Sequence, residues 1–289
     1  MTGAVDYWSN AFTVDRAPMW REVIERDGLS IRLGARDGDD FCAAADMVER
    51  MDALGIDTLV LPVIEMRGDE PIEEFHRYAV RPTELRLLAS SHPGRFAGLW
   101  SIDPDAGDAD LDATADALDR AHYVGVHLHT HSWGRPLDHP DYSPYHNLCA
   151  EYRVPFVAQA GQSGGHRDHG LGHPNGIGGP ATIHPAVTFV LSHTGFPWVS
   201  ETIDAARRHP NVVIGTATHP PRRWPEELVE FIRTDGADSV LWGTGYPLTG
   251  HGHSLGQLDA LELDDDGRTA LLGGNARRIF TRLPERSRT

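Results

Sequence analysis

The sequence contains no lysine, so all 26 of its basic residues are arginine. Without a lysine amine there is no Schiff-base catalysis and no lysine-derived metal ligand. The Gly-Lys-Ser/Thr end of a phosphate-binding loop is excluded for the same reason, and the two cysteines form no Cys-x-x-Cys motif. These absences remove several common enzyme classes from consideration.

Cysteine is scarce and long apolar runs are missing. Cys42 and Cys149 are too few for a disulfide framework, which indicates a reducing compartment. No apolar run approaches the roughly 20 residues that a membrane span needs. The first residues lack the basic region and long apolar stretch of a signal peptide. We therefore expect a cytoplasmic protein.

Positive charge is also in short supply, because the formal net charge is −16. A strongly acidic chain is a poor partner for nucleic acid or for an anionic membrane surface. The partner that we expect is a small-molecule substrate. Local clusters of arginine can still bind an anionic group, so the net charge leaves the charge of that substrate open.

Short apolar runs alternate with amphipathic helical patterns along the whole chain. This alternation is typical of βαβ units and a parallel sheet. Eight strands in 289 residues, without a linker-like change in composition, favour an α/β fold of the (β/α)₈ TIM-barrel type. We predict a single domain over residues 1–289, with a frayed tail at 283–289. The predicted strands are Val5–Phe12, Thr58–Val63, Phe96–Ile102, Gly125–His131, Pro155–Ala160, Val187–Ser192, Val212–Thr216 and Ser239–Trp242, and the predicted helices are Asp39–Leu54, Ile72–Ser91, Asp108–Ala121, Tyr145–Tyr152, Val199–Arg208 and Glu226–Thr234.

In a barrel of this type the active site lies where the strands end and the following loops begin. Polar and aromatic residues at the predicted strand ends are therefore the candidates for function. They are Trp8, Asn10, His127, His129, His131, Gln159, His193, His219 and Gly245.

Four stretches resemble the amidohydrolase-related family, which includes barrels like aminocarboxymuconate semialdehyde decarboxylase. They read VGVHLHTHSWGRPLDHPDYSPYHNLCAEYRVPFVAQAG, HPAVTFVLSHTGFPWVSETIDAARRHPNVVIGTAT, DSVLWGTGYP and GGNARRIF, and they span roughly residues 120 to 280. The N-terminal third matches only through Asp6 and its strand pattern. The resemblance implies the barrel fold and, from the oligomeric state of relatives, a homodimer.

The resemblance also implies four metal-ligand positions, and this chain departs from the family at all of them. The family has Asp-x-His-x-His on strand one, a His that ends strand five, and an Asp in Gly-Thr-Asp-Tyr-Pro on strand eight. Here these ligands are replaced by Trp8, Asn10, Gln159 and Gly245. Indole and glycine offer no ligand, and neutral amides are weak ones. We therefore predict no cofactor, with zinc at relocated ligands as an alternative.

His193 in the phrase LSHTG survives from the family pattern. The resemblance places it with the strand-six acid/base histidine of the decarboxylases, and imidazole exchanges protons near neutral pH. His127 and His129 are predicted to assist it. Because side chains alternate along a strand, we expect these two and His131 to share the face that lines the pocket.

Further residues are predicted to bind the substrate. Arginine is the usual clamp for a carboxylate, so Arg135 and the Arg222-Arg223 pair are candidates. His219 is a candidate for the pocket wall, as are Trp8, Asn10, His131, Gln159 and Tyr246. The glycine-rich stretch after strand five is predicted to be a long, mobile lid that carries His166, Arg167, Asp168, His169 and His173.

These residues favour an enzyme that works without the family's usual metal on a small carbonyl or carboxylate substrate. Hydrolysis of a β-keto, lactone or thioester carbonyl, with His193 as the acid/base group, is the leading prediction. Decarboxylation or cyclisation of an unsaturated acid is an alternative. Two others are a metal enzyme with ligands relocated to His127, His129 and His193, and a binding protein without catalytic activity.

Overall fold

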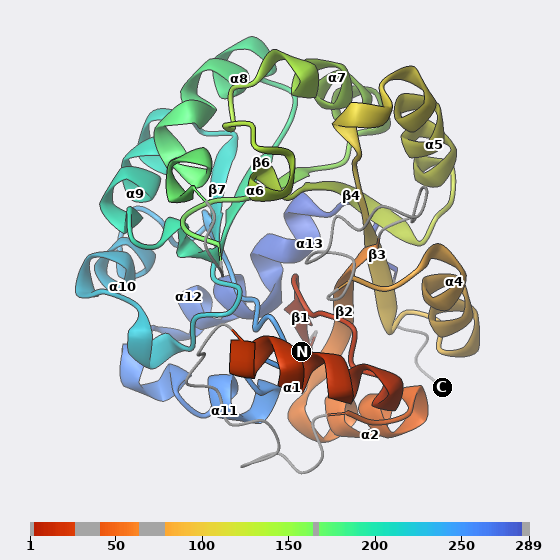
Figure 1. Cartoon of the computed structure of the whole chain (residues 1–289). Helices are drawn as coiled ribbons and strands as arrows, with labels where there is room; N and C mark the ends of the chain where they lie inside the picture. Colours follow the sequence, from red (N-terminus) through yellow and green to blue (C-terminus); the bar gives the residue numbers. More distant parts are fainter. Residues whose placement is uncertain (1–2, 27–40, 64–78, 164–167, 285–289) are drawn as a thin grey trace.

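The computed structural model describes residues 3–26, 41–63, 79–163 and 168–284. Eight parallel strands follow one another in a single sheet, in the order of the sequence. Helices surround the sheet on its outer side (Figure 1). The strands are β1 Ala4–Asp6, β2 Ile56–Val63, β3 Phe96–Ser101, β4 Tyr123–Leu128, β5 Phe156–Gln159, β6 Phe189–Ser192, β7 Val212–Gly215 and β8 Val240–Leu241.

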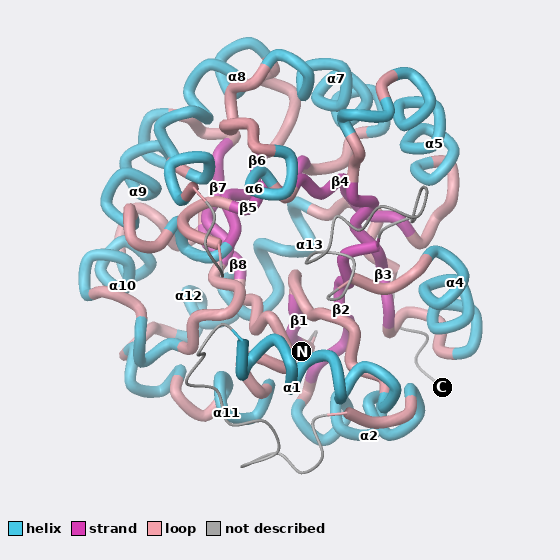
Figure 2. Tube along the Cα trace, in the orientation of Figure 1, coloured by secondary structure: helices cyan, strands magenta, loops and turns pink. Residues whose placement is uncertain are grey.

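The sheet curls until its first and last strands meet. Ser9 and Tyr246 form a parallel bridge just beyond the ends of β1 and β8. The backbone N–H of Gly245 donates to the carbonyl of Trp8 over 2.8 Å, and the N–H of Asn10 donates to that of Tyr246 over 2.8 Å. Figure 2 shows the strands arranged in this ring. The predicted TIM-barrel fold is confirmed.

The helices within the described residues vary from four to eleven residues. The prediction missed α1. It also missed α6, α8 and α11–α13, which have only four to six residues and are too short to show a helical period. The first part of the predicted helix Ile72–Ser91 lies outside the described residues. The helices are α1 Ala17–Arg26, α2 Ala44–Leu54, α4 Pro82–Ser91, α5 Asp108–Leu118, α6 Thr130–Trp133, α7 Ser143–Tyr152, α8 Gly178–Ile183, α9 Val199–Arg208, α10 Glu226–Arg233, α11 His251–Leu255, α12 Asp265–Thr269 and α13 Asn275–Ile279.

The buried residues of the strands pack into two separate layers. In β5, Phe156 and Ala158 belong to the larger cluster, which also contains residues of the surrounding helices. Val157 belongs to the smaller cluster, to which every strand contributes. Because the side-chain period of a strand is two, the smaller cluster fills the inside of the barrel and the larger one seals the helices against it.

Tyr7 fills the barrel interior at the level where the strands end. A Cβ added at Gly215 would lie 2.0 Å from the Tyr7 hydroxyl, and one added at Gly243 would lie 2.5 Å from its ring. Glycine at these two positions is what makes room for the phenol. The Tyr7 hydroxyl accepts from the backbone N–H of Ala217 over 3.4 Å. The residues above Tyr7 therefore form the floor of the barrel mouth.

Candidate functional site

The buried carboxylate of Asp6 organises the junction between β1 and β8. It accepts the backbone N–H groups of Trp8 at 3.1 Å and Thr244 at 3.0 Å, and it also accepts the Thr244 hydroxyl. The ring nitrogen Nε2 of His251, in α11, lies 3.0 Å from its second oxygen. Both Asp6 and His251 are fully buried. These contacts fix the start of the loop that follows β8.

Asn10 joins the same two strands one layer higher. Its side-chain amide donates to the carbonyl oxygen of Gly245 over 3.0 Å and accepts from the Trp8 indole N–H over 3.2 Å. Asn10 and Gly245 occupy two of the family's ligand positions, and here they hydrogen-bond to each other. The Asn10 amide is therefore engaged in structure.

Trp8 stands between two histidines at the mouth of the barrel. Its ring centroid lies 4.6 Å from that of His127 and 5.7 Å from that of His193, both in edge-on geometry. Trp8 and His127 are buried, whereas His193 keeps part of its surface exposed. An indole flanked by two imidazoles thus forms the floor of the site that the sequence predicted from strand ends.

The backbone at His193 is held in the left-handed region. Its φ is +61°, and the next two residues, Thr194 and Gly195, also have positive φ. Such a conformation is uncommon for residues other than glycine and is enriched at functional sites. The turn brings Ser192 Oγ within 2.7 Å of His193 Nδ1. Burial, and then the neighbouring His219 and His131, lower the pKa of His193 to about 3. The imidazole is therefore neutral at physiological pH.

His127 is held in the same way as His193. It lies in β4 directly beside Ser101 of β3, and its Nδ1 is 3.0 Å from the serine hydroxyl. Burial, and then the nearby His193, holds the pKa of His127 well below its usual value. Two imidazoles of the site are thus neutral, and each faces a serine through the same nitrogen.

The prediction that three histidines share one strand face is wrong. Strand β4 ends at Leu128, and the chain then turns into the single helical turn α6. His129 is the residue before that turn, with its Nδ1 2.6 Å from Ser132 Oγ. His131 lies inside the turn, against the backbone of Gly172, where a Cβ would come within 2.8 Å of its ring. Only His127 keeps the strand geometry that the alternation predicted.

Gln159 and His219 come from the next strand ends. Gln159 is the last residue of β5, is paired in register with Ser192 of β6, and is nearly buried. His219 follows β7, and its pKa is lowered mainly by burial. Its ring lies 5.6 Å from that of Phe196, whose side chain is 42% exposed. Phe196 is therefore a rim residue that the sequence reasoning missed.

Four other residues predicted to bind substrate are ion-paired, buried or exposed on the surface, and none is shown to line the barrel mouth. Arg135 forms ion pairs with Asp105 at 2.7 Å and Asp141 at 3.3 Å, so its charge is already balanced. Tyr246 is fully buried, lies stacked on His251 at 4.5 Å, and accepts from Arg50 over 2.7 Å. Arg222 and Arg223 are exposed on the short turn after β7.

Residues 164–167 of the loop after β5 lie outside the described residues, and with them the predicted candidates His166 and Arg167. From Asp168 the chain forms two short 3₁₀ turns that lead into α8. Asp168 accepts from Gly170 N–H over 2.9 Å, and His173 packs on Trp198 with ring centroids 4.7 Å apart. This half of the predicted lid is folded onto the barrel.

One serine motif was overlooked in the sequence. Residues Gly161 to Gly165 have the Gly-x-Ser-x-Gly spacing of a nucleophile elbow, with Ser163 at its centre directly after β5. An elbow needs a helix that starts at the serine, and the residues that follow, 164–167, lie outside the described part.

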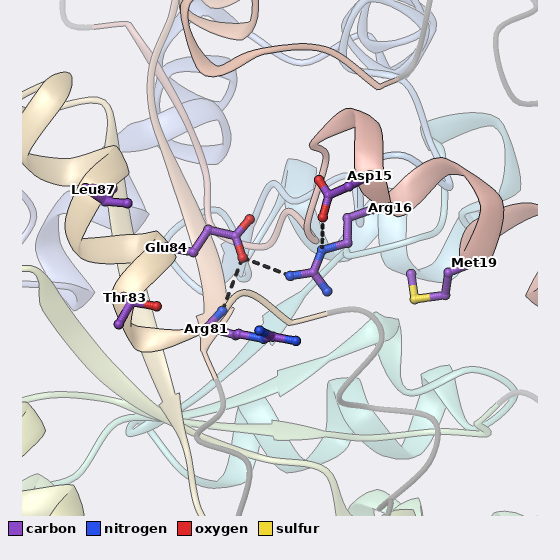
Figure 3. Close-up of a pocket in the computed structure, with 7 residues that line it drawn as sticks. All are labelled: Asp15, Arg16, Met19, Arg81, Thr83, Glu84 and Leu87. Atoms are coloured by element: carbon purple, nitrogen blue, oxygen red, sulfur yellow. Dashed lines mark hydrogen bonds and ion pairs between the residues drawn. The ribbon is translucent and has the colours of Figure 1, made fainter.

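A surface cavity of about 430 Å³ lies between residues 15–19 and the start of α4 (Figure 3). Its charged lining is internally paired, because Arg16 lies 2.8 Å from Glu84 and 3.6 Å from Asp15. None of the predicted site residues lines it.

A protein metal centre needs several donor side chains that converge on one point. Within residues 3–26, 41–63, 79–163 and 168–284, no group of three or more His, Cys, Asp or Glu side chains is arranged to hold a metal ion. Asp6 is saturated by hydrogen bonds, and the Asn10 amide binds Trp8 and Gly245. The described residues at the family's ligand positions therefore do not fit such a centre.

Comparison with known proteins settles the family. The amidohydrolase family matches residues 39–282, which is most of the chain. The chain belongs to the amidohydrolase family. Among curated proteins, none matches this member. The described part of this amidohydrolase contains no helix long and apolar enough to cross a membrane.

Solved structures show the same fold at low identity. An uncharacterised TIM-barrel protein from Bordetella bronchiseptica is 21% identical, with a TM-score of 0.75 over 97% of this chain and 99% of its own. A dihydroxybenzoic acid decarboxylase from Polaromonas is 16% identical, with a TM-score of 0.69 over 97% of each chain. A putative 2-pyrone-4,6-dicarboxylic acid hydrolase from Pseudomonas putida is 19% identical, with a TM-score of 0.59 over 99% of this chain and 100% of its own.

The prediction that the protein has no cofactor is contradicted by these neighbours. The Polaromonas decarboxylase contains bound manganese, and so does a similar structure, a 5-carboxyvanillate decarboxylase from Novosphingobium aromaticivorans. The prediction took the four replaced ligands as evidence about the cofactor. The loss of those four ligands says nothing about donor side chains elsewhere in the chain, such as His166.

Proposed function

We propose that this amidohydrolase hydrolyses an activated carbonyl, a lactone or a β-keto or thioester carbonyl, with His193 as the principal catalytic residue. Water adds to the carbonyl carbon. The bond from this carbon to the ring oxygen of a lactone, to the sulfur of a thioester or to the α-carbon of a β-keto substrate then breaks, and the leaving group takes up the proton that the water releases. The products are a carboxylic acid and an alcohol, enol or thiol.

The observation that carries the proposal is the pair of neutral imidazoles on either side of Trp8. His127 and His193 both lie at the mouth of the barrel in edge-on contact with its indole. Their pKa values are lowered by burial, and that of His219 is lowered too. Neutral imidazoles in a partly dry site can stabilise the negative charge that develops on a carbonyl oxygen.

Decarboxylation is the second candidate, because most of the similar solved structures are decarboxylases of aromatic acids. After carbon dioxide leaves, such a reaction needs a proton for the ring carbon. An imidazole with a pKa of about 3 is almost never protonated at neutral pH, so His193 is a poor source of that proton. The site chemistry therefore favours hydrolysis, for which the Pseudomonas hydrolase offers a fold precedent.

A panel of substrates tests the proposal. Lactones, β-keto thioesters and dihydroxybenzoates are incubated with the protein, with added manganese and with chelator in parallel, so that the result does not depend on the metal content. Acid release shows hydrolysis, and carbon dioxide release shows decarboxylation.

His193→Gln should lower the turnover of the best lactone or thioester at least 100-fold. The matched control is His169→Gln on an exposed turn, which should keep wild-type turnover. Carbon dioxide as the only product would overturn the proposal.

A further inference from the structure

Two serine–histidine pairs of the same geometry lie on either side of Trp8. Ser192 Oγ is 2.7 Å from Nδ1 of His193, and Ser101 Oγ is 3.0 Å from Nδ1 of His127. Both serines are the last residues of their strands, β6 and β3, and both are buried. The sequence reasoning used the histidines and overlooked the serines.

The hydroxyl of Ser192 decides which nitrogen of His193 carries the hydrogen. A serine hydroxyl has one hydrogen to donate, and a buried donor without an acceptor costs about 1–3 kcal/mol. Within the described part of the chain, Nδ1 of His193 is the acceptor within hydrogen-bond distance of this hydroxyl. The bond is therefore satisfied when Ser192 donates and Nδ1 accepts. In a neutral imidazole the hydrogen must then lie on Nε2.

We propose that Ser192 is a positioning residue that locks His193 in the Nε2–H tautomer, so that His193 meets the substrate carbonyl oxygen as a neutral hydrogen-bond donor. The proposal rests on the carbonyl chemistry of the proposed function. A neutral histidine that polarises a carbonyl through its N–H is an established use of imidazole. The hydrogen stays on Nε2 throughout, and its bond shortens as negative charge collects on the oxygen.

The surroundings of His193 favour its role as a neutral hydrogen-bond donor. The backbone turn with φ of +61° fixes the ring next to Ser192, and the Trp8 edge limits its rotation. His219, His131 and His127 all interact electrostatically with His193, and a positive charge on any of them would oppose its protonation. A ring that cannot become an imidazolium at neutral pH works poorly as a base, and its N–H remains available.

The tautomer can be read directly by nitrogen-15 NMR of the full-length protein labelled at histidine. The chemical shifts of the two ring nitrogens distinguish Nε2–H, Nδ1–H and the imidazolium. The His193 signals are assigned by their loss in His193→Gln. We expect hydrogen on Nε2 and an unprotonated Nδ1, unchanged from pH 5 to 8. In Ser192→Ala the lock is removed, and the Nδ1–H form should rise to a measurable fraction.

Two variants keep the test independent of folding. Ser192→Thr keeps a hydroxyl and should retain the wild-type signals of His193. Ser101→Ala should change the signals of His127 and leave those of His193 as they are. Hydrogen on Nδ1 of His193 in the wild-type protein would overturn the proposal, as would titration of His193 between pH 6 and 7. No substrate enters this measurement, so a failed substrate screen overturns the proposed function and leaves the tautomer result standing.

Discussion

The side-chain amide of Asn10 donates a hydrogen bond to the backbone carbonyl of Gly245 over 3.0 Å. These two residues lie 235 positions apart, at the ends of the first and last strands of the barrel. In relatives with a metal centre, both positions supply ligands, according to the family resemblance. In this protein they connect the strands directly, and the loop after β8 is held by hydrogen bonds.

Restoring an acid at Gly245 should damage the fold. Gly245 has a φ of +62°, and a Cβ there would lie 2.5 Å from Thr218 Oγ1 and 2.8 Å from its backbone nitrogen. Gly245→Asp should lower the free energy of unfolding by about 2 kcal/mol or more, as measured by urea denaturation. Gly179→Ala is the control, because its Cβ would meet nothing within 4 Å, and it should stay within about 0.5 kcal/mol of wild type. A Gly245→Asp protein as stable as wild type would show that the turn can rearrange.

Removing the Asp6 carboxylate should be among the most destabilising single changes in the described chain. Asp6→Ala leaves two backbone N–H groups, the Thr244 hydroxyl and His251 without their buried acceptor. We expect a loss of about 3–5 kcal/mol of unfolding free energy. The matched control is Asp259→Ala, which breaks an exposed ion pair with Arg268 and should cost less than about 1 kcal/mol. Equal losses in the two variants would contradict this ranking.

His146 should make the protein less stable in mild acid. It is buried in α7 against Phe156 and Phe189, at ring distances of 4.6 and 5.1 Å, and burial lowers its pKa from 6.5 to about 3. Between these values the unfolded chain binds a proton that the folded chain does not, so stability falls as the pH drops from about 6.5 toward 3.

The variant His146→Phe should remove this contribution. Its unfolding free energy should depend less steeply on pH than that of wild type, by up to about 1.4 kcal/mol per pH unit in the same window. Denaturation curves at half-unit steps of pH measure the two slopes. Parallel slopes would mean that His146 protonates equally well in the folded protein.

Phe196 should affect substrate binding more than stability. Its exposed ring lies beside His219 on the rim of the site, and its backbone is held by bonds to Gln162 and His193. Phe196→Ala should raise the KM of a planar substrate roughly 5- to 20-fold, with an unfolding free energy within about 0.5 kcal/mol of wild type. Ile183→Ala removes another exposed apolar side chain, on α8, and should leave KM unchanged. An equal rise in both variants would argue against contact between Phe196 and the substrate.

The sequence predicted the barrel because strand and helix periods alternate strongly and do not depend on distant contacts. The alternation also misled, since His127, His129 and His131 have strand spacing although the chain turns into α6 after Leu128. A single helical turn is too short to impose its own period on a sequence.

The partners of Asp6 could not be predicted, because Thr244 and His251 lie 238 and 245 residues away and belong to no common motif. Ser192, in contrast, is adjacent to its partner His193 in the sequence. Its hydrogen bond to His193 still could not be predicted, because that bond depends on the backbone and rotamer geometry of the turn and not on sequence spacing.

The contacts of Asp6 with Thr244 and His251, which join β1 to the loop after β8 and form the seam of the barrel, also bear on how the barrel closes during synthesis. Asp6 leaves the ribosome 238 residues before Thr244 and 245 residues before His251. Contacts so distant in sequence form late in folding, because the entropy of closing the whole chain must be lost first. Until then the carboxylate that will be fully buried stays in water. Until β8 has been made, the seam cannot close, and the edge of β1 that will meet β8 has no partner strand.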